Sequence, residues 1–164
     1  MIVQEDGKLI RAKFAKTISE AEGRAQKLTA KLQARKVHAD VLIFCKAELL
    51  ADNYFHAVLE AVKSVADKLR AKTGLSDDGG TLIDRALLGD LPILIINAHQ
   101  TFSEKSEQKG FANIIKGTFG MFRNPMAHEA KIKWEITEED AIDLLSLVSL
   151  IHRKLDKAKM QVRV

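Results

Sequence analysis

The sequence predicts an all-α fold, a helical bundle with no more than a short extended segment or a hairpin added to it. Of its 164 residues, 46% are hydrophobic, which is enough for one ordinary core. Only nine glycines and two prolines interrupt the chain, and apolar residues recur at helical spacing along most of it. The single cysteine, Cys45, excludes a disulfide framework and a Cys/His zinc pattern, and we expect it to lie in the core.

The first forty residues carry the excess of positive charge. Residues 1–40 hold nine Lys and Arg against five Asp and Glu, whereas the rest of the chain holds seventeen of each. Asp6-Gly7 is typical of a small hairpin turn, and apolar residues from Phe14 to Leu32 then recur at spacings of four and three, which predicts one helix. We therefore divide the chain into a basic helical extension, residues 1–37, and a helical domain, residues 38–164.

Basic residues on the other faces of this first helix suggest a binding surface. They could follow the phosphate backbone of RNA or contact an acidic protein, although a solvated bundle helix explains the same charges. The residues that we assign to this surface are Lys27, Lys31, Arg35 and Lys36.

The next two helices are expected over residues 39–51 and 53–73. The second is the clearest amphipathic helix in the chain, with apolar residues at helical spacing from Phe55 to Leu69 and Gly74 as its stop. Its opposite face is charged, which is typical of a solvated surface. A carboxylate and a lysine one turn apart, here Glu60 and Lys63, could also line a cleft.

Residues 81–122 predict two more helices with a break between them. A capping box from Thr81 to Asp84 opens a short helix, and the run from Ile93 to Asn97 fits either a buried strand or the start of a helix. Helical spacing returns between residues 104 and 122. Three glycines weaken this helix by up to about 1 kcal/mol each relative to Ala, so we expect close helix packing at Gly110, Gly117 and Gly120.

The C-terminal part of the chain begins with a second break. Pro125 disfavours helical geometry at Asn124, and the alternating residues 132–136 suggest a short extended segment. Thr137, followed by three acidic residues, opens the last helix near Glu138. That helix is apolar on two sides, so it needs two partners. One partner is its own bundle, and a second subunit could be the other.

Common catalytic motifs are absent, which leaves one pair of residues with complementary chemistry. His128-Glu129 lacks the second histidine of a zinc hydrolase, and no P-loop or Rossmann glycine motif occurs. Arg123 and His128 flank the break at Pro125. Metal-independent RNA cleavage needs a base, an acid and a cation that stabilises phosphate, and His and Arg supply these. An arginine paired with an acid and a histidine capping a turn would explain the same residues.

The surrounding sequence resembles a known family. GFANIIKGTFGMFRNPMAH, followed by WEITEEDAIDLLSLVSLIHRKLD, is similar to the C-terminal signature of the Ymh-type family of the HEPN superfamily. The likeness extends more loosely back to Phe55–Lys63, so it covers roughly residues 38–160. It implies an α-helical bundle that usually dimerises. Many HEPN proteins are metal-independent endoribonucleases, whose Arg-x4-6-His motifs from two subunits meet in a shared cleft, and many act in toxin-antitoxin, abortive-infection or antiphage systems.

The resemblance also implies residue roles. Arg123 would bind the phosphate, His128 would act as general base or acid, and Asn124 would be the polar residue that often follows the arginine. Pro125 makes the local backbone differ from HEPN proteins whose motif lies within one continuous helix. Glu60 and Lys63 fall where charged helper residues occur in the family.

Together these inferences predict a cytoplasmic, homodimeric endoribonuclease that cuts RNA by 2′-hydroxyl attack without a metal or other cofactor. An antitoxin or another neutralising protein is a candidate partner. We expect no membrane association, because no apolar run approaches the roughly 18 residues of a membrane span. Two alternatives remain open: a non-catalytic module that binds RNA or protein, and a purely structural helical dimer.

Overall fold

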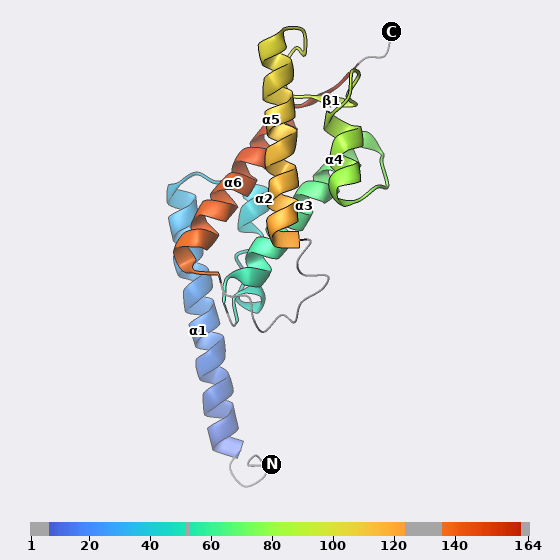
Figure 1. Ribbon diagram of the computed structural model, residues 1–164. Helices are drawn as coiled ribbons and strands as arrows, with labels where there is room; N and C mark the ends of the chain where they lie inside the picture. Colours follow the sequence, from blue (N-terminus) through green and yellow to red (C-terminus); the bar gives the residue numbers. More distant parts are fainter. Residues whose placement is uncertain (1–6, 52, 124–135, 162–164) are drawn as a thin grey trace.

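Helices dominate the structure, which confirms the all-α prediction. The computed structural model describes residues 7–51, 53–123 and 136–161 (Figure 1). The elements in chain order are α1 (Gly7–Ala34), α2 (Ala39–Leu42), the 3-10 helix η1 (Ala47–Leu49), α3 (Phe55–Thr73), α4 (Gly79–Leu87), β1 (Leu94–Ile95), α5 (Phe102–Thr118), the π-helix η2 (Phe119–Arg123), α6 (Glu138–Lys157) and β2 (Lys159–Met160). None of the helices in these ranges is long and apolar enough to cross a membrane.

The core is built around α3, which packs against α6, α4, α2, η1 and η2. Its apolar positions are almost completely buried, as the amphipathic pattern predicts. The helix ends where expected, because Gly74 adopts the left-handed conformation (φ 73°) that a C-cap requires and its N–H donates to the Arg70 carbonyl. Cys45 is buried in the same core, as predicted, and burial raises the pKa of its thiol to about 11.

The long helix α1 joins the bundle through its C-terminal half. Leu28 and Leu32 are buried where α1 packs against η1 and α6. The N-terminal half extends past the other helices (Figure 1). The prediction of a hairpin turn at Asp6-Gly7 is wrong at Gly7, because Gly7 is the first residue of α1. Asp6 lies outside the described residues.

Two helix boundaries differ from the sequence predictions. Residues 39–51 form the short helices α2 and η1 in place of one helix, because 3-10-type turns after Val41 let Val41, Cys45 and Leu50 all reach the core. The helix expected from Thr81 starts earlier, at Gly79, so Thr81 lies within α4 and does not cap it.

The segment after α4 forms a strand. β1 pairs with β2 in an antiparallel ladder in which Leu94 lies opposite Met160, and Gln161 N–H donates to Ile93 O at 2.9 Å. The ladder joins the loop before α5 to the C-terminal end of α6. Periodicity could not select this strand, since its partner lies more than sixty residues away.

The helix expected over residues 104–122 is also present, but its glycines are not closely packed. Thr101 caps α5 and forms a capping box with Glu104. A Cβ at Gly110, Gly117 or Gly120 would meet no other element within 4 Å in the described part of the chain. Our prediction of close packing there is therefore wrong for the single chain.

The last helix begins at Glu138, as predicted. Thr137 caps it by accepting a hydrogen bond from Asp140 N–H at 3.2 Å, and three acidic residues in its first turn complement the helix dipole. Both apolar sides of α6 find partners within the chain, because it contacts α1 and α2 as well as α3. Ile142 and Ile151 are buried this way, whereas Leu150 stays exposed.

A buried glutamine ties α5 to the segment that precedes it. Gln108 is 1% exposed, and its amide donates to Leu87 O at 3.0 Å and to Leu94 O at 2.8 Å. Its Oε1 accepts from Ile96 N–H at 3.0 Å. These three hydrogen bonds go to the backbone at the end of α4 and around β1.

We expect Gln108→Leu to lower the free energy of unfolding by several kcal/mol, because three buried backbone groups would each lose a partner at about 1–3 kcal/mol. Urea titration followed by circular dichroism measures this. The exposed Gln33→Leu is the control and should stay within about 0.5 kcal/mol of wild type. Equal stability of the two variants would contradict the role of Gln108.

Candidate functional site

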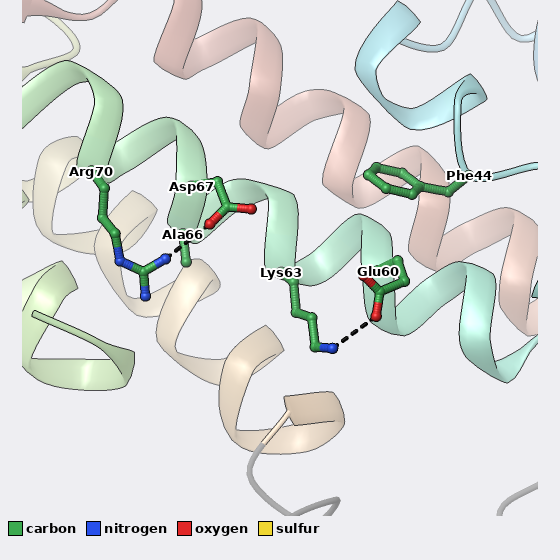
Figure 2. A pocket seen from close by; sticks show the side chains of 6 residues that line it. All are labelled: Phe44, Glu60, Lys63, Ala66, Asp67 and Arg70. Atoms are coloured by element: carbon green, nitrogen blue, oxygen red, sulfur yellow. Dashed lines mark hydrogen bonds and ion pairs between the residues drawn. The ribbon is translucent and has the colours of Figure 1, made fainter. Parts of the chain in front are cut away.

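The charged face of α3 and Phe44 line a pocket. The pocket has a volume of about 210 Å³ and is drawn in Figure 2. Lys63 Nζ lies 2.7 Å from Glu60 Oε1, and Arg70 Nη1 lies 2.9 Å from Asp67 Oδ1. The structure thus brings Glu60 and Lys63 together as one ion pair on one turn of the helix. The residues that line the pocket are Phe44, Glu60, Lys63, Ala66, Asp67 and Arg70.

The two cations of this pocket differ in how firmly they are held. Arg70 also binds the loop before α4, since its Nη2 lies 2.5 Å from Asp78 Oδ1 and its Nε donates to Asp77 O at 3.1 Å. Among the described residues, Lys63 has Glu60 as its ion-pair partner, and its side chain is half-exposed. Arg70 is therefore a structural residue, whereas Lys63 is able to turn toward an incoming anion.

The helix η2, which ends at Arg123, lies next to α3. η2 packs against α3, and Figure 2 shows the end of this faint-orange helix beside Lys63. Phe119 and Phe122 anchor η2 in the core, and Arg123 is its last residue. The side chain of Arg123, and all of Asn124 and His128, lie outside the described residues. π-Helical turns are frequent at functional sites, and sequence periodicity did not predict this one.

The four basic residues assigned to a binding surface do not form one free row. Lys27 and Lys31 lie 3.2 Å and 2.9 Å from the two carboxylate oxygens of Glu138. Their hydrogen bonds, that of Lys31 foremost, lower the pKa of Glu138. Arg35 lies 3.4 Å from Asp143, and Lys36 is a surface residue with φ 54°. The pairs with Glu138 connect α1 to the start of α6, which is a structural use of these charges.

A polar cluster between α2, α3 and α6 was not predicted from the sequence. His38 caps α2 by accepting from Asp40 N–H at 3.0 Å, and its Nε2 lies 2.7 Å from Asp156 Oδ2. Lys68 Nζ lies 2.8 Å from Asp40 Oδ2 and 2.5 Å from Asp156 Oδ1, and these hydrogen bonds lower the pKa of both carboxyl groups. His38 is separated from Asp156 by more than a hundred residues, so no local motif reveals the cluster.

His152 is the buried member of this cluster. It is 1% exposed, its Nε2 lies 2.9 Å from Ser64 Oγ, and Ser64 donates its proton to Ala61 O at 2.6 Å. We therefore assign the proton of His152 to Nε2. Burial lowers the pKa of His152 to about 4, and the charge of Lys68 adds to the shift.

His38, Asp40 and His152 are also the described residues best placed to hold a metal ion, since their ligand atoms lie within 4.8 Å of one another. Two observations favour a structural role. The ammonium of Lys68 already lies on Asp40, and the two imidazole rings are stacked with an interplanar angle of 20°. The in-plane lone pairs of nearly parallel rings do not converge on one ion.

We expect the stability of the protein to fall between pH 6.5 and about pH 4 because of His152. In the unfolded chain His152 binds its proton near pH 6.5. In the folded chain, where Asp40, Lys68, His38 and Asp156 lie around it, His152 binds the proton only near pH 4. The unfolding free energy should drop by about 3 kcal/mol across this window.

Urea titrations at several pH values would measure this dependence. His152→Gln should flatten the curve in this window, whereas His56→Gln, a histidine outside the cluster, should keep the wild-type slope. Parallel curves for wild type and His152→Gln would show that another group is responsible.

Comparison with known proteins gives one match. The family described as "Protein of unknown function (Hypoth_ymh)" matches residues 35–155. No curated protein and no solved structure matches the chain. The matched residues include α3, the pocket on its charged face, η2 and most of α6.

Proposed function

Because the chain belongs to the Hypoth_Ymh family, we propose that it is a metal-independent endoribonuclease with Arg123 and His128 at its active site. The observation that carries the proposal is the sequence Arg123-Asn-Pro-Met-Ala-His128, which starts on the last residue of η2. η2 in turn packs against the helix that holds Glu60 and Lys63. Arg123 therefore ends an element that contacts the helix of the half-exposed Lys63, and His128 follows five residues later in the sequence.

In the proposed reaction the 2′-oxygen of the RNA replaces the 5′-oxygen on phosphorus. His128 of one subunit takes the proton of the 2′-hydroxyl, the 2′-oxygen attacks phosphorus, and the bond to the 5′-oxygen breaks. The second copy of His128 protonates the leaving 5′-oxygen. Arg123 binds the phosphate oxygens through its planar guanidinium and stabilises the charge that develops there. The products are a 2′,3′-cyclic phosphate and a 5′-hydroxyl.

An exposed face of α5 and η2 supports a homodimer. Gly110, Ile114, Gly117 and Met121 follow one another at spacings of four, three and four, which places them on one side of the helix. Ile114 is 43% exposed and Met121 60% exposed, and the glycines have open space beside them. A second copy packed along this face would compensate for the glycines. The face ends two residues before Arg123, so pairing of two copies with their α5 helices parallel would bring two Arg123 residues to the same end.

The cellular role that we propose is that of a toxin in a toxin-antitoxin, abortive-infection or antiphage system. This part of the proposal rests on the resemblance to HEPN proteins. A ribonuclease without a required cofactor has no metal or cosubstrate to limit it, so a neutralising partner protein is the expected means of control.

We expect Arg123→Ala and His128→Ala each to lower the rate of RNA cleavage by at least about a hundredfold, because each removes a group that acts in the transition state. The assay uses purified dimer, a defined RNA and EDTA, with product ends analysed for 2′,3′-cyclic phosphate. Arg85→Ala and His56→Ala, matched changes elsewhere, should keep the wild-type rate. Cleavage that survives both active-site changes, or that requires a divalent metal, would refute the mechanism.

We expect Ile114→Glu combined with Met121→Glu to convert the dimer into a folded monomer, because two charges would face each other across the interface. Sedimentation measures the mass, and cleavage should be lost with the dimer. Leu91→Glu, at another exposed apolar residue, is the control. A monomer that cleaves at the wild-type rate would contradict the shared cleft.

A further inference from the structure

A second pocket, larger than the one on α3, lies beside α5. It has a volume of about 620 Å³ and lies between the end of α4 and the first turns of α5. This volume is within the range of small-molecule sites, about 300–1,000 Å³. The polar residues that line it are Asp90, His99, Lys105, Gln108 and Lys109.

Two lysines bring uncompensated positive charge to this pocket. Lys105 and Lys109 lie one turn apart on α5, where like charges repel each other. Neither forms an ion pair within the described part of the chain. The neighbouring lysines behave differently, since Lys116 lies 2.5 Å from Asp84 and Lys154 lies 2.6 Å from Glu107. An anion in the pocket would supply the missing partner.

His99 adds a strained residue and an unused polar atom. Its φ is 56°, in the left-handed region that residues with a side chain rarely adopt, and its N–H donates to Asn97 Oδ1 at 3.0 Å. Asn97 is in turn held by the backbone of Glu104 at 2.8 Å. The Nδ1 of His99 is buried without a hydrogen-bond partner in the described structure. The loop therefore holds the His99 ring at the pocket that the two lysines line.

Gln108 and Asp90 are the other polar residues of the lining, and they limit the further contacts that a ligand could make in this pocket. Gln108 forms part of the lining, but its amide is fully used by the backbone bonds around β1. Asp90 is an acceptor that would repel an anion and attract a hydroxyl or amino group. An acidic residue with this role binds ribose hydroxyls in dinucleotide-binding proteins.

We propose that this pocket binds a phosphate-bearing small molecule of mononucleotide size. Lys105 and Lys109 contact the phosphate, because their ammonium groups offer donors and positive charge without an ion-pair partner in the described part of the chain, and His99 contributes a ring N–H from the same pocket. Asp90 accepts a hydrogen bond from the sugar. This site is independent of the proposed ribonuclease activity, since it uses none of Arg123, His128, Glu60 and Lys63.

The test is calorimetric titration of the full-length protein with inorganic phosphate and with adenosine monophosphate. The double variant Lys105→Gln, Lys109→Gln should weaken the binding of both by at least tenfold. Lys46→Gln combined with Lys157→Gln removes the same charge elsewhere and should change affinity by less than twofold. Asp90→Asn should weaken binding of the nucleotide, whereas binding of inorganic phosphate should not weaken, because the change removes a negative charge from the pocket.

A conservative variant separates binding from folding. His99→Asn keeps a residue that tolerates positive φ, so the loop should retain its conformation while phosphate affinity falls. Circular dichroism and thermal melting confirm that each variant is folded. The proposal is overturned if the wild type binds neither probe, if the lysine variant binds as well as the control, or if only an RNA oligonucleotide binds. None of these outcomes bears on cleavage by Arg123 and His128.

Discussion

Burial of α3 is the constraint on which the rest of the structure depends. Its small and medium apolar residues, such as Ala57, Ala61 and Val62, have no exposed surface. A helix of this kind needs neighbours along most of its circumference, and α6, α4, α2, η1 and η2 supply them. The accessible side of α3 includes Glu60, Lys63, Asp67 and Arg70, and these four residues line the candidate site. The demand for burial therefore decides where polar chemistry can occur on this helix.

A few buried polar residues complete the bundle by joining segments that are distant in sequence. Gln108 bonds the backbone around β1, and His152 connects α6 to Ser64 on α3. Ser149 accepts from His38 N–H at 2.7 Å, which connects α6 to the start of α2. Because an unpaired polar group in the interior is costly, these bonds specify how the helices align. Apolar packing alone is less selective.

Positive charge is used in two different ways in this protein. Lys27, Lys31 and Lys68 lie on carboxylates of α6 or α2 and hold helices together. Lys105 and Lys109 line a pocket and have no such carboxylate in the described structure. The same residue type is a structural element in the first group and a candidate ligand-binding group in the second. Net charge or a row of lysines in the sequence cannot separate these uses, because each depends on what the fold places opposite.

By itself the sequence determined the helical class, the extent of α3 with its stop at Gly74, the cap of α6 and the adjacency of Glu60 and Lys63. These features follow from periodicity and from contacts within one helical turn. It also contains the Arg123 and His128 motif, whose geometry lies outside the described residues. Tertiary structure alone decided the rest. β1, the His38 and His152 cluster, the pairing of Lys31 with Glu138 and the pocket at His99 all join residues far apart in the chain. Local propensity carries no information about such partners, since they meet only when the core is packed.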